Sequence, residues 1–251
     1  MASSYKTLLN NDIASTRTML HEAIPLTGTI VSGTYSDNNI KTYSHGMFES
    51  VYDYPYLSSS ANHIFDLTVG YSANSSMSGA SSVQNAKKIN IYTQMAQVLA
   101  GYDATGSIRE FDRDGDLTGG DKIREAIFVN FTRLLSKDEI KKESFSFTVY
   151  TGSTCVQPTG ALTIQDHGAI SSYKVNSPAG EYALLTTSST SDPGFAVGLL
   201  YYQAGIAVLT ASIFTNPDES IGELYYGLRP AAAKYTMNGA LTGSSITGSC
   251  G

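Results

Sequence analysis

Residues 195–214 read FAVGLLYYQAGIAVLTASIF, a stretch of twenty residues that carries no formal charge. A helix that crosses a bilayer needs about twenty apolar residues, so length alone permits a membrane span. Gln203, Ala204 and Gly205 interrupt the stretch in the middle, and glycine allows the positive φ that a tight turn often requires. The two halves are rich in Val, Ile, Tyr and Phe, which suit pleated strands. The stretch therefore predicts a β-hairpin.

The residues that flank this stretch favour the same interpretation. Turn signals stand at both ends, DPG at 192–194 and NPD at 216–218. The nearest charged residues are Asp192, Asp218 and Glu219, whereas a membrane helix more often has Lys or Arg near one end. Both strands are apolar on both faces, so we expect the hairpin to be buried in a sheet or covered by a partner.

Composition limits the classes of function. The chain has 251 residues, a formal charge of −6 and only 15% charged residues, which argues against a nucleic-acid partner. The first residues, MASSYKTLLNND, lack the apolar core of a secretory signal, so we expect synthesis in the cytoplasm. Cys155 and Cys250 have no metal-like spacing. We expect no cofactor and no membrane partner.

Hydrophobic periodicity predicts an α+β fold, with helices mainly in the first 140 residues and an antiparallel sheet dominating the C-terminal half. The expected helices cover residues 5–24, 83–100 and 121–135. The expected strands cover 28–35, 64–71 and 144–151, followed by the segments ALTIQ, YKV, EYALLTT, the hairpin and ELYYGL. We divide the chain into a mixed α/β part (1–143), a β-rich part (144–238) and a flexible or partner-ordered tail (239–251).

One acidic segment, residues 112–116 (DRDGD), resembles a metal-binding loop. With Asp114 at position 1, Asp116, Thr118 and Glu125 fall at positions 3, 5 and 12 of an EF-hand loop, with Gly119 at position 6 and a helix expected to follow. Against a calcium site, positions 8 and 9 are charged and the preceding helix ends too early. A solvated acidic loop is the alternative.

Two other functions have residues that could carry them. Tyr43, Tyr52, Tyr54 and Tyr56 are candidates for stacking on sugars in a carbohydrate- or receptor-binding β module, although packing in a core or an interface is the favoured interpretation of these tyrosines. A hydrolase would draw on His63 and Asp66 with the serines at 58–60, but no GxSxG elbow is present. No GxGxxG or GxxxxGK[ST] motif supports nucleotide binding.

Four segments carry a resemblance to a known family. They are HGMFESVYDYPYLSSSANHIFDLTVGYS (45–72), KKINIYTQMAQVLAGYD (87–103), FVNFTRLLSKDEIKKESFSFTV (128–149) and PGFAVGLLYYQAGIAVLTASIF (193–214). They resemble virion structural proteins of contractile-tailed, marine-type bacteriophages.

That resemblance implies a multicopy component of the neck, tail or baseplate in the virion, without catalytic residues. The implied partners are other virion proteins, and a homo-oligomer or ring is expected. Low charge and abundant Tyr and Ser agree with a chain that makes protein–protein contacts, for which Tyr52, Tyr54, Tyr56, Tyr201 and Tyr202 are the interface candidates.

Overall fold

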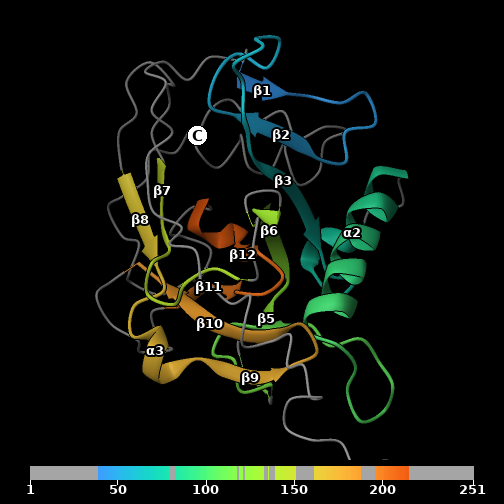
Figure 1. Ribbon diagram of the computed structural model, residues 1–251. Coiled ribbons are helices and arrows are strands. Elements are labelled where there is room, and N and C mark those ends of the chain that lie inside the picture. Colours follow the sequence, from blue (N-terminus) through green and yellow to red (C-terminus); the bar gives the residue numbers. More distant parts are fainter. Residues whose placement is uncertain are drawn as a thin grey trace, which may run out of the picture.

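The computed structural model describes residues 39–79, 83–117, 119–120, 122–132, 135, 139–150, 161–187 and 196–214. Most of the regular structure in these residues is one antiparallel sheet of ten strands, which curls into a half-barrel (Figure 1). Along the sheet the strand order is β1-β2-β3-β6-β12-β11-β10-β8-β7, and β9 pairs with β10. The strands are β1 (Ile40–Lys41), β2 (Glu49–Tyr52), β3 (His63–Tyr71), β6 (Glu125–Asn130), β7 (Ser146–Tyr150), β8 (Ala161–Gln165), β9 (Lys174–Ser177), β10 (Gly180–Thr186), β11 (Ala196–Tyr201) and β12 (Ile206–Thr210).

The remaining elements lie outside this sheet. β4 (Phe111–Asp112) and β5 (Lys122–Ile123) pair with each other in a small hairpin. The helical elements are α2 (Val83–Leu99), the short α3 (Ala169–Ser172) and two 3-10 turns, η3 (Ser76–Gly79) and η6 (Ala211–Phe214).

The hairpin expected at 195–214 is confirmed. β11 and β12 pair antiparallel with Leu199 opposite Val208, and the turn between them includes Gly205 with a φ of 64°. β10 pairs with the outer side of β11, and β6 pairs with the outer side of β12. Every residue of β11 is buried, so the hairpin lies within this chain's own sheet. None of the helices in the described part of the chain is long and apolar enough to cross a membrane.

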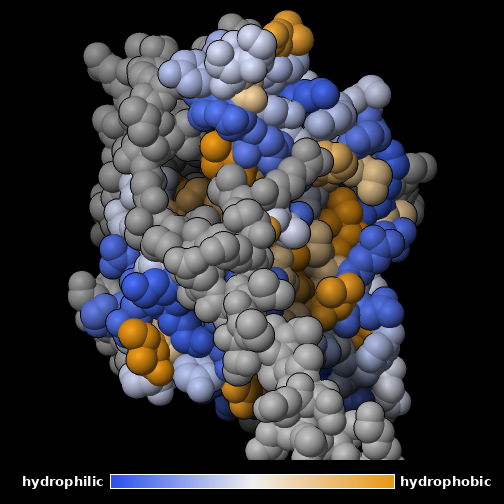
Figure 2. Space-filling view, in the orientation of Figure 1, coloured by the Kyte–Doolittle hydropathy of each residue, from blue (hydrophilic) through white to orange (hydrophobic). Residues whose placement is uncertain are grey.

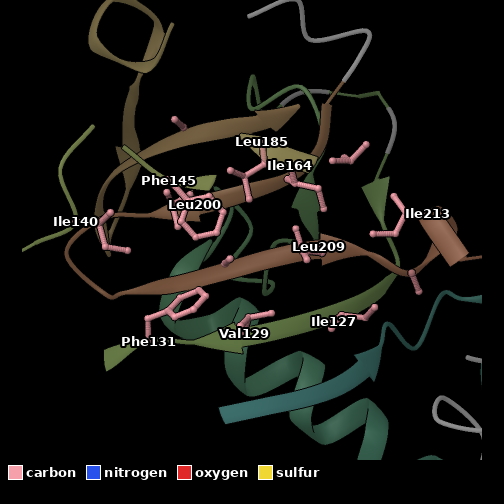
Figure 3. Packing of buried hydrophobic residues seen from close by; sticks show 14 of the residues in the cluster. Ile127, Val129, Phe131, Ile140, Phe145, Ile164, Leu185, Leu200, Leu209 and Ile213 are labelled. Atoms are coloured by element: carbon pink, nitrogen blue, oxygen red, sulfur yellow. The ribbon is translucent and has the colours of Figure 1, made fainter. Parts of the chain in front are cut away.

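The sheet buries apolar side chains on both faces because alternate residues of a strand point in opposite directions. On one face, Ile127 and Val129 of β6 pack with Leu209 of β12 and with Leu185 and Leu200 of the neighbouring strands (Figure 3). On the opposite face, the intervening residues pack under α2 and the β4–β5 hairpin. That second cluster includes Phe128, Val208, Leu199, Leu184, Tyr92, Leu99, Phe111 and Ile123.

Helix α2 confirms the expectation for residues 83–100. Tyr92, Ala96 and Leu99, which recur at helical spacing, lie on one face of the helix and are buried. The helix packs on β3 at Gly70, where an added Cβ would lie 2.8 Å from the carbonyl oxygen of Lys88 and 2.9 Å from the amide nitrogen of Tyr92. A glycine is therefore required at this position for the backbone of α2 to approach the sheet so closely.

The prediction of a helix over 121–135 is wrong, since β5 and β6 occupy this region. The helical spacing of Ile123, Ile127 and Phe131 coincides with a run of apolar residues that fills both faces of a central strand. Short apolar runs of this kind do not distinguish a buried strand from a buried helix.

This result changes the fold class. The described part of the chain is mostly β-sheet with few helices, and the expectation that helices would be concentrated in the first 140 residues is wrong. The strands expected at 64–71, 144–151 and in ALTIQ, YKV and EYALLTT are confirmed as β3, β7, β8, β9 and β10. The remaining expectations lie outside the described residues. They are the helix at 5–24, the strands at 28–35 and in ELYYGL, the tail at 239–251 and both cysteines.

The sheet also crosses the boundary that we drew at 143/144. β6 from the first part pairs with β12 from the second, over a register that runs from Asn130–Ile206 to Ala126–Thr210. The two parts therefore contribute strands to one continuous sheet.

Candidate functional site

The connection between β2 and β3, residues 53–62, presents apolar side chains to solvent; we call it the tyrosine loop. Leu57 is 86% exposed, Tyr54 48% and Tyr56 37%. In Figure 1 this connection lies at the top of the molecule, and Figure 2 shows hydrophobic surface at the same place. An exposed leucine alone is ordinary, but here it stands beside two exposed aromatic side chains.

Hydrogen bonds at the base of the tyrosine loop hold it in one conformation. The carboxylate of Asp53 accepts from the backbone N–H of Asn62 at 2.6 Å and from Nδ2 of Asn62 at 2.9 Å. The backbone N–H of Asp53 donates to the carbonyl of Asn62 at 3.1 Å, and the N–H of Ser58 donates to the carbonyl of Pro55 at 2.8 Å. The hydrogen bonds from Asn62 lower the pKa of Asp53, so this carboxylate stays ionised and remains an acceptor.

Ring contacts attach the tyrosine loop to the sheet. Tyr52, at the end of β2, lies 6.4 Å from Tyr56 and 5.4 Å from His63, measured between ring centroids. Tyr43 stacks instead with His45 at 5.3 Å in the connection that precedes β2, so it belongs to a separate aromatic group. The four tyrosines considered for sugar binding therefore divide into two groups, one on each side of β2.

The other two interface candidates are inside the protein. Tyr201 is 2% exposed and Tyr202 is 0% exposed. Tyr201 stacks on Tyr182 with a centroid distance of 5.0 Å, while Tyr202 donates a hydrogen bond to Asp166. Both tyrosines pack in the chain's own core, and the structure leaves neither on the surface. The sequence could not show this because interface and core favour the same aromatic residues.

His63 and Asp66 do interact, although they are three residues apart on a strand. A register irregularity between Val51 and Tyr52 on the facing β2 accompanies this placement. Nε2 of His63 lies 2.7 Å from Oδ1 of Asp66, and the hydroxyl of Ser50 donates to the same oxygen at 2.6 Å. Here the carboxylate stands between serine and histidine. In a serine-hydrolase triad the histidine stands between the other two, so this arrangement differs from that geometry.

The acidic segment adopts a different arrangement from an EF-hand loop. Glu125 begins β6, and its carboxylate accepts a hydrogen bond from Ser75. Thr118 lies outside the described residues. A strand follows the loop where the EF-hand pattern needs a helix. The carboxylates that converge are instead those of Asp112, Asp114 and Asp116, with one oxygen of each within 4.8 Å of the others.

Tyr92 positions the strands that carry this acidic cluster. Its hydroxyl donates to the carbonyl of Ile123 at 2.7 Å and accepts from the N–H of Phe111 at 3.2 Å, so it bridges β4 and β5. Asp112 ends β4, and its Oδ2 accepts from Nζ of Lys122 at 2.7 Å. Burial raises the pKa of Asp112, and Lys122 opposes that rise.

A buried charged pair lies in the region where α2 packs on the sheet. Glu49 of β2 is 5% exposed and Lys88 of α2 is 1% exposed. Burial raises the pKa of Glu49 to about 7 and lowers the pKa of Lys88 to about 8, while each charge partly offsets the burial of the other. Nζ of Lys88 has no hydrogen-bond partner among the described residues, so the pair interacts through charge at longer range. No local pattern predicts this pair, because the two residues are far apart along the chain.

Comparison of the chain with protein-family models, with curated proteins and with solved structures finds no match in any of the three.

Proposed function

We propose that this chain is a structural subunit of a tailed-phage virion, in the neck, tail or baseplate, and that it works through protein–protein contacts. The observation that carries the proposal is the tyrosine loop, which exposes Leu57, Tyr54 and Tyr56 from a base fixed by Asp53 and Asn62. The four resembling segments supply the phage context.

A loop of this kind suits a protein partner for two reasons. Its conformation is already ordered, so binding loses less conformational entropy than the ordering of a flexible loop would cost. Tyrosine and apolar side chains are also enriched at interface cores, where they provide area and a hydroxyl for hydrogen bonding. In the proposed assembly, Leu57 and Tyr54 are covered by a neighbouring virion protein or by a second copy.

The sheet edges offer a second means of contact. β1 and β7 end the strand order, and neither has a second strand partner among the described residues. An unpaired edge can accept a strand from another chain. The proposed homo-oligomer or ring has these edges and the tyrosine loop available for its contacts.

Particles of a phage that encodes this chain provide the test. Quantitative mass spectrometry of purified virions is expected to find the chain at a fixed ratio to the major capsid protein. Complementation of a null phage with Leu57→Asp is expected to lower the titre at least tenfold. Val175→Asp is the matched control, because Val175 on β9 is 70% exposed. Absence of the chain from purified particles refutes the proposal; equal titres for both variants refute the role of the loop.

A carbohydrate-binding module is the second candidate, favoured by the exposure of Tyr54 and Tyr56 on the same loop. Exposed aromatic rings provide flat faces for stacking. A glycan array with the full chain separates the two functions. Saturable binding of a sugar that is lost in Tyr54→Ser, together with absence from virions, favours the carbohydrate module.

A further inference from the structure

The acidic cluster consists of three alternate aspartates, of which Asp112 ends β4 and Asp114 and Asp116 follow it. Asp112 is buried, Asp114 is half-buried and Asp116 is exposed, and one oxygen from each lies within 4.8 Å of the others. Three carboxylates this close repel one another, while Lys122 supplies a positive charge at 2.7 Å from Asp112 and Arg113 lies within the same segment. The arrangement concentrates negative charge at one point of the surface.

A second observation concerns the buried member of this cluster. The Asp112 side chain is 1% exposed, and only its Oδ2 is engaged by Lys122. Its Oδ1 is buried and accepts from no nitrogen or hydroxyl group among the described residues, and the carboxyl group of Asp114 lies beside Asp112. A buried carboxylate oxygen without a donor is costly, and proteins satisfy such atoms with a hydrogen bond or a metal ion. We propose that Asp112, Asp114 and Asp116 together bind a calcium ion.

The donor set favours calcium, and its spacing allows the three carboxylates to share one ion. Carboxylate oxygens are the ligands of hard divalent cations. Two oxygens on one ion cannot be farther apart than twice the metal–oxygen distance, which is about 4.6–5.2 Å for calcium and about 4.0–4.2 Å for magnesium. The three carboxylates lie within 4.8 Å of one another and can share one calcium ion. Magnesium usually takes only one or two protein carboxylates and keeps several waters. Solvent at the exposed Asp116 can complete the coordination.

The loop that carries the cluster is anchored to the main sheet. The carbonyl oxygen of Gly115 accepts from Nδ2 of Asn176 at 3.1 Å and lies 3.1 Å from the hydroxyl of Tyr182. These contacts hold the backbone between Asp114 and Asp116 against β9 and β10. The ligands are therefore preorganised, whereas the adjacent ammonium group of Lys122 weakens cation binding. We expect a dissociation constant of about 0.1–1 mM, as in calcium sites of moderate charge.

Isothermal titration calorimetry of the full chain with CaCl2, after treatment with a chelator, tests the proposal. Saturable binding is expected in this range, and Asp114→Asn is expected to weaken it at least tenfold. Asp103→Asn is the control, because it removes one negative charge from another loop and its Oδ1 still accepts from Thr105 and Ser107. Asp112→Asn is unsuitable as the main variant, since Asp112 is also the partner of Lys122.

Terbium provides a second readout on the same variants. Tyr182 lies beside the loop, so excitation of tyrosine is expected to produce terbium emission that CaCl2 displaces and that Asp114→Asn reduces at least tenfold. Absence of saturable binding up to about 10 mM CaCl2, well above the range of such sites, refutes the site. Equal binding by wild type and Asp114→Asn also refutes it, and equal affinity for MgCl2 refutes the assignment to calcium.

Discussion

The hydroxyl of Tyr202 donates a 2.8 Å hydrogen bond to the buried carboxylate of Asp166. The same carboxylate accepts the backbone N–H groups of Glu143 at 2.7 Å and Phe145 at 3.1 Å. Tyr202 follows β11, Asp166 follows β8, and the two amides precede β7. One side chain thus joins the central hairpin to the far end of the sheet.

We expect Asp166→Asn to lower the free energy of unfolding by about 2–3 kcal/mol, because an amide nitrogen then faces a donor and leaves it unsatisfied. Tyr202→Phe removes one donor only and is expected to cost about 1–2 kcal/mol. Urea denaturation followed by circular dichroism measures both. Equal stability of Asp166→Asn and wild type contradicts this account.

Gly70→Ala is expected to destabilise the protein by about 2–3 kcal/mol, since a Cβ at this position forces α2 away from β3. Gly79→Ala is the control, because an added Cβ there meets no atom within 4 Å. The midpoints of thermal unfolding of the two variants are compared, since the added Cβ meets backbone atoms in Gly70→Ala and open space in Gly79→Ala. A Gly70→Ala midpoint equal to that of Gly79→Ala argues against direct packing of α2 on the sheet.

Glu49→Gln is expected to change the pH dependence of stability. The pKa of Glu49 rises from 4.5 to about 7 on folding. Below pH 4.5 the contribution of this carboxyl group to the free energy of unfolding is fully present, and that contribution is lost as pH rises through about 7. Between pH 4 and 8 wild type should therefore lose about 3 kcal/mol of unfolding free energy relative to Glu49→Gln.

Urea denaturation of wild type and Glu49→Gln at several pH values in this range measures the difference in their stability. Lys88 loses its countercharge in the variant, which adds an offset, so the slopes are compared and not the absolute stabilities. Exposed Glu143→Gln serves as the control and is expected to follow the wild-type slope. Parallel curves for wild type and Glu49→Gln contradict the raised pKa.

Leu57→Ser is expected to leave the free energy of unfolding within about 0.5 kcal/mol of wild type, because substitutions at exposed positions have small effects. This prediction separates the role of the tyrosine loop in contacts from a role in folding. Chemical denaturation of the purified full chain measures it. If the free energy of unfolding falls by more than about 2 kcal/mol, Leu57 contributes to the stability of the fold.

Some elements of the candidate sites could be predicted from local sequence. The acidic segment and the tyrosines at 52–56 were identified as binding candidates. Which carboxylates converge was not predicted, since Asp112 joins the cluster while Glu125 binds Ser75. The hydrolase hypothesis names His63 and Asp66 with the serines at 58–60, whereas the serine that binds Asp66 is Ser50 from a neighbouring strand, which has no signal in the local sequence.

The sequence by itself determined the elements whose evidence is local: the hairpin around Gly205, the helix α2 and the strand β3. Turn chemistry and side-chain period act over a few residues, so they can be read along the chain. The tertiary structure decided the rest. It made residues 125–130 a central strand, buried Tyr201 and Tyr202, and paired Glu49 with Lys88. Each of these outcomes depends on contacts between residues far apart in sequence, where local propensity is overridden by burial on both faces of one sheet.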